Sequence, residues 1–193
     1  MRAFIILILL AAAGYYLYSR HGASAAQPSG DELPAEIAWR MVSRDQRGAV
    51  TFVAIVAVNG NRWRCEGGDP NQRNTPFVTV SDGSAAAAST PKVSATSLDP
   101  RPPMRLILRG IRHASPTATE QIAGLPYLHF AQTLNGNSYH VWAEPKTRFP
   151  FQVRGPGYFD IYTVLPALSE RNIPNLFSIH SLTPLLSRYA TTQ

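Results

Sequence analysis

Residues 49–58 constrain the fold most, because they are apolar on both faces of an extended strand. Alternate side chains of a strand point to opposite sides, so Phe52 and Val56 share one face while Val53 and Ile55 share the other. Such a strand belongs in the middle of a sheet, covered above and below. It is too short to span a bilayer, and its β-branched residues favour a strand over a helix.

The neighbouring residues predict that this strand lies in a meander. Residues 36–43 form a second strand, and the loop between the two ends in Gly48, which suits a left-handed turn position. An Asn-Gly-Asn turn at 59–61 leads into a strand around Trp63. Residues 76–80 add another short strand.

Residues 81–103 differ from this pattern. They contain Ala85–Ala88, repeated serines and threonines, and four prolines, with almost no large apolar side chain. This composition buries too little surface to offset the entropy of ordering, so we expect a flexible loop here.

The second half of the chain predicts further strands and short helices. We expect a strand over 104–112, a short helix from Ser115 to about Gly124, a strand over 158–165, and a C-terminal helix from Thr183 to near Tyr189. Between these, residues 127–134 and 138–144 form a hairpin about Asn135-Gly136-Asn137. The hairpin's alternation puts Leu128, Phe130, Leu134, Tyr139, Val141 and Ala143 on a core face, and Tyr127, His129, Thr133, His140, Trp142 and Glu144 on the opposite face.

Taken together, the patterns predict a β-rich α+β fold. It is an antiparallel sheet or sandwich with two to three short helices, preceded by one N-terminal hydrophobic helix. The expected organisation is a signal-anchor or signal peptide at 1–22, a spacer at 23–34, and a single exported domain at 35–193 interrupted by the loop at about 81–103.

The N-terminal segment indicates export. Residues 3–18 carry no charge and no proline, and as a helix they span about 24 Å. Tyrosines at the end of the segment and Arg20 favour a retained inner-membrane anchor, whereas the small residues at 23–26 favour cleavage, which would leave a periplasmic or secreted protein. The predicted anchor residues are Phe4, Ile5, Leu7, Leu10, Tyr15, Tyr16 and Tyr18.

The basic charge is weak evidence for a nucleic-acid partner. The chain has 18 Lys+Arg against 12 Asp+Glu, a formal net charge of +6, but its arginines are dispersed along the sequence. Nucleic-acid binders usually cluster their cations on one face. We therefore expect no nucleic acid among the partners.

Signatures of enzymes are missing from the sequence. It contains no GxSxG elbow, no P-loop and no GxGxxG motif, so no catalytic residue, cofactor or metal is assigned. Cys65 is the only cysteine, which excludes a disulfide scaffold. It shares a strand face with Trp63, which predicts a buried thiol; an intermolecular disulfide and a nucleophile are the alternatives.

The polar face of the second hairpin is the best candidate for a ligand or partner surface. It comprises Tyr127, His129, His140, Trp142 and Glu144. The aromatic rings can stack on a flat ligand, and the histidines and glutamate are metal-compatible types. The alternative is an ordinary solvent-facing side of an antiparallel pair.

Three functions remain open. The leading hypothesis is a membrane-anchored, non-enzymatic component of a bacterial envelope assembly of the secretion or conjugation type, with protein partners. The alternatives are a small exported hydrolase using the His129, His140 and Glu144 face or Cys65, and a periplasmic ligand-binding module.

Overall fold

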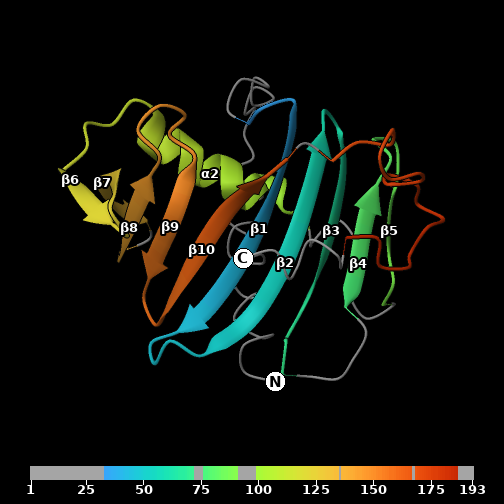
Figure 1. Ribbon diagram of the computed structural model, residues 1–193, viewed down its shortest axis with the longest axis horizontal. Helices are drawn as coiled ribbons and strands as arrows, with labels where there is room; N and C mark the ends of the chain where they lie inside the picture. The colour runs from blue at the N-terminus through green and yellow to red at the C-terminus, as the bar shows by residue number, and fades with distance from the viewer. Residues whose placement is uncertain (1–32, 72–75, 91–98, 135, 167, 187–193) are drawn as a thin grey trace.

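The computed structural model describes residues 33–71, 76–90, 99–134, 136–166 and 168–186. Within them the chain forms one ten-stranded sheet, antiparallel throughout, and one helix (Figure 1). The strands are β1 (Glu36–Asp45), β2 (Val50–Asn59), β3 (Arg62–Gly68), β4 (Phe77–Ser81), β5 (Ala86–Ala88), β6 (Ala118–Ile122), β7 (Leu125–Leu134), β8 (Asn137–Ala143), β9 (Pro150–Gly155) and β10 (Tyr158–Leu165), and the helix is α2 (Arg101–Arg112).

The β-rich antiparallel prediction is confirmed, in its single-sheet form. The strand order is β5-β4-β3-β2-β1-β10-β9-β8-β7-β6. Strands β1 to β5 form one meander and β6 to β10 form another, and β1 pairs with β10 to join them. Of the two to three short helices expected, the described residues contain α2 alone. The expected N-terminal helix lies outside the described residues.

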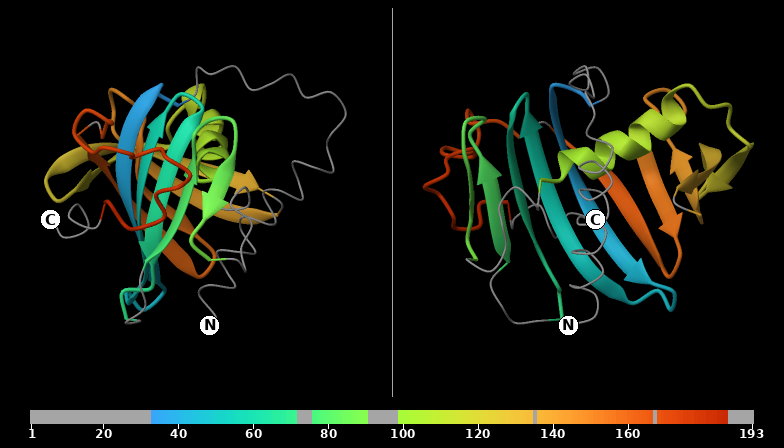
Figure 2. Two further views of the ribbon diagram at one scale, coloured as in Figure 1. Left: turned by 90° about the vertical axis from the view of Figure 1, so that its right-hand side faces the viewer. Right: turned by 180° about the vertical axis from the view of Figure 1, so that it is seen from behind.

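The sheet is covered on both sides near β2, as the apolar strand predicts. On one side, which we call the helix face, Val56 and Val58 pack in a buried cluster with Met104 and Leu108 of α2. On the other, which we call the second face, Ile55 packs in a cluster with residues of the 168–186 segment. Figure 2 shows α2 and this C-terminal segment on opposite sides of the sheet.

The two hairpins form as the sequence predicts. The β1–β2 turn places Gly48 at a φ of 83°, a left-handed conformation that glycine adopts without a steric penalty. In the β7–β8 hairpin, Leu134 pairs with Asn137. Phe130, Val141 and Ala143 are buried on the helix face, as expected.

The strand expected over 104–112 is wrong, because these residues belong to α2. Met104, Leu108 and Ile111 are buried, and their spacing of four and three residues places them on one side of a helix. Prolines lie in the first turn of α2, where the backbone N–H groups have no acceptor within the helix, so proline's missing N–H costs no hydrogen bond. At the other end, Arg148 Nη1 donates to the carbonyl oxygens of Ile111, Arg112 and Ala114.

The helix expected from Ser115 is also wrong. The chain instead enters β6, which pairs with β7, and Thr117 N already donates to His129 O at 2.8 Å. Residues 183–186 are not helical either, and Glu66 accepts the N–H groups of Leu185 and Leu186. Residues 187–189 of that expected helix lie outside the described residues.

The segment expected as a flexible loop contains regular structure near both ends. Ser81 ends β4, Ala86–Ala88 form β5, and α2 begins at Arg101. Residues 91–98 lie outside the described part. No helix in the described residues is both long and apolar enough to cross a membrane.

Candidate functional site

The β7–β8 hairpin brings three of the five predicted site residues together on the second face. His129 of β7 pairs directly with Trp142 of β8. His140 of β8 pairs with Ala131, which follows His129 on the same face of β7. The His129 and Trp142 rings are stacked with centroids 4.7 Å apart and an interplanar angle of 7°. The His140 ring lies 5.1 Å from that of His129 and 6.0 Å from that of Trp142.

A fourth residue, Glu120 of β6, ties this stack together. Its Oε1 lies 3.0 Å from His129 Nδ1, and its Oε2 accepts a 2.8 Å hydrogen bond from Trp142 Nε1. One carboxylate therefore holds both rings and keeps them parallel. We call Glu120, His129, His140 and Trp142 the imidazole cluster.

Sequence reasoning missed Glu120 because it assigned this residue to the first turn of a helix. In β6, Glu120 pairs with Tyr127. This register places the Glu120 side chain on the second face, beside the histidines. The local signal for a strand here is an acidic residue that precedes an alternating pattern. Many helix starts carry an acidic residue in the same place, so the signal does not distinguish the two.

Each ring nitrogen of His129 has a polar neighbour. Nδ1 lies 3.0 Å from Glu120 Oε1 and 3.3 Å from Thr117 Oγ1, and a hydrogen on Nδ1 suits the carboxylate, which only accepts. His129 Nε2 lies 2.9 Å from His140 Nδ1. When His129 is neutral, its Nε2 accepts from His140 Nδ1, and His140 Nε2 keeps a lone pair. When His129 is protonated, the hydrogen bond reverses and His140 Nε2 carries a hydrogen.

Trp142 does not offer an open stacking surface. Its residue is 9% exposed, and His129 covers one face of its ring. A ligand or partner therefore meets the histidines before it meets the indole.

The other two predicted residues make contacts outside the imidazole cluster. Tyr127 lies across from Glu120 in the β6–β7 pair, but its ring stacks on Phe151 of β9, with centroids 4.4 Å apart. Glu144 follows the end of β8 and accepts hydrogen bonds from the backbone N–H groups of Lys146 and Thr147. These bonds, the one from Thr147 most of all, lower the pKa of the Glu144 carboxyl. Glu144 therefore stabilises the turn before β9.

Cys65 is buried and free, as its strand pattern predicts. Burial, and then the charges of Glu66 and Asp99, raise the pKa of its thiol to about 12. The thiol stays protonated at neutral pH, and because only the thiolate is a strong nucleophile, this environment weighs against the alternative of a nucleophilic Cys65.

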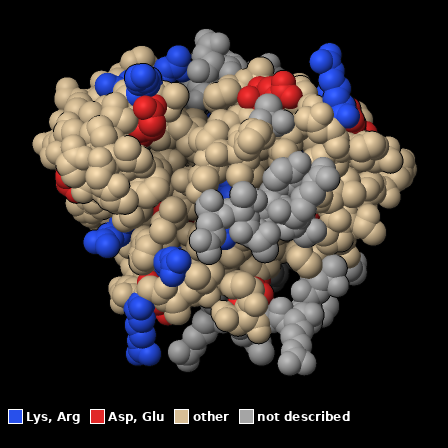
Figure 3. Space-filling view, viewed as in Figure 1, with Lys and Arg blue, Asp and Glu red and all other residues tan. Residues whose placement is uncertain are grey.

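No group of three histidine, cysteine, aspartate or glutamate residues in the described part of the chain is placed to hold a metal ion. On the face seen in Figure 3, lysine and arginine side chains are scattered and form no continuous patch. The predicted anchor residues, Phe4 to Tyr18, lie outside the described residues.

No protein-family model matches the sequence, and no curated protein matches it either. Solved structures that align with the fold include PNGF-II in two crystal forms, in the C2 and P21 space groups. Each is 9% identical to this chain, with a TM-score of 0.35, over 74% of this chain and 30% of the PNGF-II chain. The chain thus spans less than a third of the length of the protein it aligns with.

Proposed function

We propose that the chain is a non-enzymatic interaction domain that binds a protein partner in a bacterial envelope assembly of the secretion or conjugation type. The apolar N-terminal segment tethers it to the inner membrane, with the sheet on the periplasmic side. The observation that carries this proposal is the open edge of the sheet at β6.

Strand β6 is the last in the sheet and pairs with β7 alone among the described strands. Its outer side therefore has N–H and C=O groups without a strand partner. Ala118, Thr119 and Gln121 are exposed, and so is Leu125 at the adjoining turn. An exposed edge of this kind can accept an extended segment of another protein as an added strand.

The imidazole cluster lies directly beside this edge, since β6 supplies Glu120. Backbone pairing at an edge gives affinity with little selectivity, and neighbouring side chains supply the selectivity. Here the partner's side chains would meet His129 and His140, which can donate or accept hydrogen bonds according to their protonation. We therefore propose a partner whose extended segment carries a polar or acidic side chain opposite the cluster.

Photo-crosslinking in intact cells tests the proposal. A photoreactive phenylalanine analogue replaces Thr119 on β6 in the full chain, and the same analogue at exposed Arg171, in the C-terminal segment, is the control. We expect one defined protein adduct from position 119 and none from position 171. His140→Ala should reduce the yield of that adduct severalfold without lowering the melting temperature.

The proposal is overturned if position 119 labels no protein, or if both positions label the same proteins in equal yield. If the adduct forms in unchanged yield in His140→Ala, the imidazole cluster is not part of the interface, and the proposal that it selects the partner is overturned.

An exported hydrolase is the second candidate, favoured by the row of contacts in which Glu120 Oε1 lies 3.0 Å from His129 Nδ1 and His129 Nε2 hydrogen-bonds to His140 Nδ1. No described residue hydrogen-bonds to His140 Nε2, so this nitrogen is available as a general base for a water molecule. A panel of chromogenic esters and peptides separates the two candidates. Hydrolysis that His140→Ala abolishes would favour the hydrolase, and an inactive chain that still crosslinks would exclude it.

A further inference from the structure

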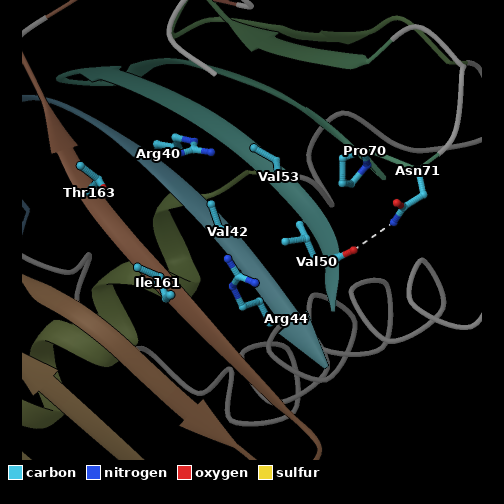
Figure 4. A pocket seen from close by; sticks show the side chains of 9 residues that line it. All are labelled: Arg40, Val42, Arg44, Val50, Val53, Pro70, Asn71, Ile161 and Thr163. Atoms are coloured by element: carbon cyan, nitrogen blue, oxygen red, sulfur yellow. Dashed lines mark hydrogen bonds between the residues drawn. The ribbon is translucent and has the colours of Figure 1, made fainter. Parts of the chain in front are cut away.

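A groove of about 600 Å³ lies on the second face, with β9 between its strands and those of the imidazole cluster. Strands β1, β2 and β10 form it, together with Pro70 and Asn71 (Figure 4). Two arginines of β1, Arg40 and Arg44, line it along with Val42, Val53 and Ile161.

Arg40 carries the one buried guanidinium nitrogen that lacks a hydrogen-bond partner in the part of the chain that the structure describes. Arg62, Arg64 and Arg101 each pair with a carboxylate. Arg40 Nε is buried and has no hydrogen-bond acceptor. No described carboxylate pairs with Arg44 either, whose Nη1 donates to Gly48 O at 2.8 Å.

A buried guanidinium N–H without an acceptor is unfavourable, and folded proteins rarely leave one unpaired. An arrangement of this kind is stable at low cost only if something else supplies the acceptor. The guanidinium fork matches the oxygen atoms of a phosphate or a carboxylate. Arg40 therefore points to an anionic group as the missing partner.

The rest of the groove indicates what carries that anion. Val42 lies between Arg40 and Arg44 on the same side of β1, and Val53 and Ile161 flank it from β2 and β10 (Figure 4). The two arginines are four residues apart, about 13 Å along a strand. A ligand that reaches between them lies on apolar side chains, and burying apolar surface there favours binding.

We propose that this groove binds an amphipathic anion, with a phosphate or carboxylate at Arg40 and an apolar body along Val42, Val53 and Ile161. Arg44 closes the other end and attracts further negative charge. The site goes beyond the proposed partner at the β6 edge, and either can fail without the other.

The test uses the full chain in nanodiscs of neutral phosphatidylcholine. Hexyl phosphate, inorganic phosphate and hexanol are titrated in turn, and the Nε–H resonance of Arg40 is followed by NMR. We expect saturable shifts with hexyl phosphate, weaker binding of inorganic phosphate, and no shift with hexanol. Replacing part of the lipid by phosphatidylglycerol distinguishes a lipid headgroup from a free small molecule as the source of the anion.

Two charge-matched variants make the result specific. Arg40→Gln should weaken binding of hexyl phosphate by about 10- to 100-fold, as expected for the loss of a charge-assisted hydrogen bond. Arg47→Gln removes the same charge from the exposed β1–β2 turn and should leave the affinity unchanged. For Arg40→Gln, whose own resonance is lost, binding is followed by calorimetry alongside the wild type.

The melting temperature of the free protein separates a binding role from a structural one. If Arg40 serves a ligand, Arg40→Gln melts at the wild-type temperature or above, since it removes a buried donor that has no acceptor. The proposal is overturned if Arg40→Gln lowers the melting temperature, if Arg47→Gln weakens binding equally, or if neither hexyl phosphate nor phosphatidylglycerol shifts the Arg40 resonance.

Discussion

Arg64 and Glu66 form a fully buried ion pair on β3, and the same two side chains hold the C-terminal segment against the sheet. The guanidinium donates to the carbonyl oxygens of Leu176, Ser181 and Thr183, and the carboxylate accepts the N–H groups of Leu185 and Leu186. The pair thus satisfies backbone groups of a segment that has no helix or strand of its own. It explains how irregular chain can cover the second face of β1 to β3.

Glu66→Gln should therefore destabilise the protein strongly. The change leaves Arg64 charged and buried without its carboxylate, and breaking such a pair costs about 3–5 kcal/mol. Urea denaturation of the full chain measures the loss. Arg62→Gln is the matched control on the same strand, because its ion pair with Glu170 has side chains 38% and 44% exposed and is worth at most about 1 kcal/mol. Equal losses in the two variants would contradict this account.

Asp160 should make the fold less stable as the pH rises. Burial on β10 raises the pKa of its carboxyl from 3.8 to about 6, although hydrogen bonds from Ser43 and Tyr162 oppose the shift. The folded protein therefore binds a proton more tightly than the unfolded chain, so stability falls between about pH 4 and pH 6 and stays low above it. Asp160→Asn should be more stable than wild type at pH 8, by up to about 3 kcal/mol.

Urea denaturation at pH 4, 5, 6 and 8 checks this prediction. Glu36→Gln, at an exposed position at the start of β1, serves as the control and should follow the wild-type profile. An Asp160→Asn profile parallel to that of the wild type would show that Asp160 does not titrate in this range.

Gly110 allows α2 to approach β7 closely. A Cβ at this position would lie 2.6 Å from Gln132 Oε1, so Gly110→Ala forces the half-buried Gln132 side chain to move. The close atoms all belong to the end of one flexible side chain, so the move is cheap, and we expect Gly110→Ala to keep only part of the gain of about 1 kcal/mol that alanine brings to a helix. In a Gln132→Ala background the contact is absent, and the same change should give the full gain. A thermal-denaturation cycle of the four variants measures the difference, and equal gains in both backgrounds would refute the contact.

Cys65 should be inert in the folded protein. With a thiol pKa of about 12 and full burial, very little of it is thiolate at pH 8. We expect no reaction with a thiol-specific disulfide reagent under native conditions and one equivalent of reaction in urea. Rapid native modification would show that β3 opens easily and would restore the question of a functional thiol.

Local patterns were enough to predict the hairpins. The β1–β2 and β7–β8 turns carry Gly48 and Gly136 at positions with a positive φ, and alternation on either side assigns Phe130 and Val141 to the core. The three-ring part of the candidate site, His129, His140 and Trp142, followed from the same alternation. These predictions use residues that are close in sequence, where turn chemistry acts.

The errors arose where two local patterns were both present. Residues 104–112 alternate charge with apolar side chains, but they also place Met104, Leu108 and Ile111 on one side of a helix. Which pattern prevails depends on the surface that covers them, and buried residues from β1 to β3 and from β7 to β10 form that surface. Ser115 and Pro116 resemble a helix start, yet pairing with β7 draws the chain into a strand and places Glu120 beside His129.

By itself, the sequence determined that the chain is β-rich, where its main hairpins turn, and which hairpin face is polar, because turn preferences and side-chain alternation act over a few residues. Only the tertiary structure decided that all ten strands form one sheet, that Glu120 completes the imidazole cluster, and that Arg64 and Glu66 secure the C-terminal segment. These features depend on contacts between residues up to 120 positions apart, such as Glu66 with Leu186, and no local pattern encodes which distant segments meet.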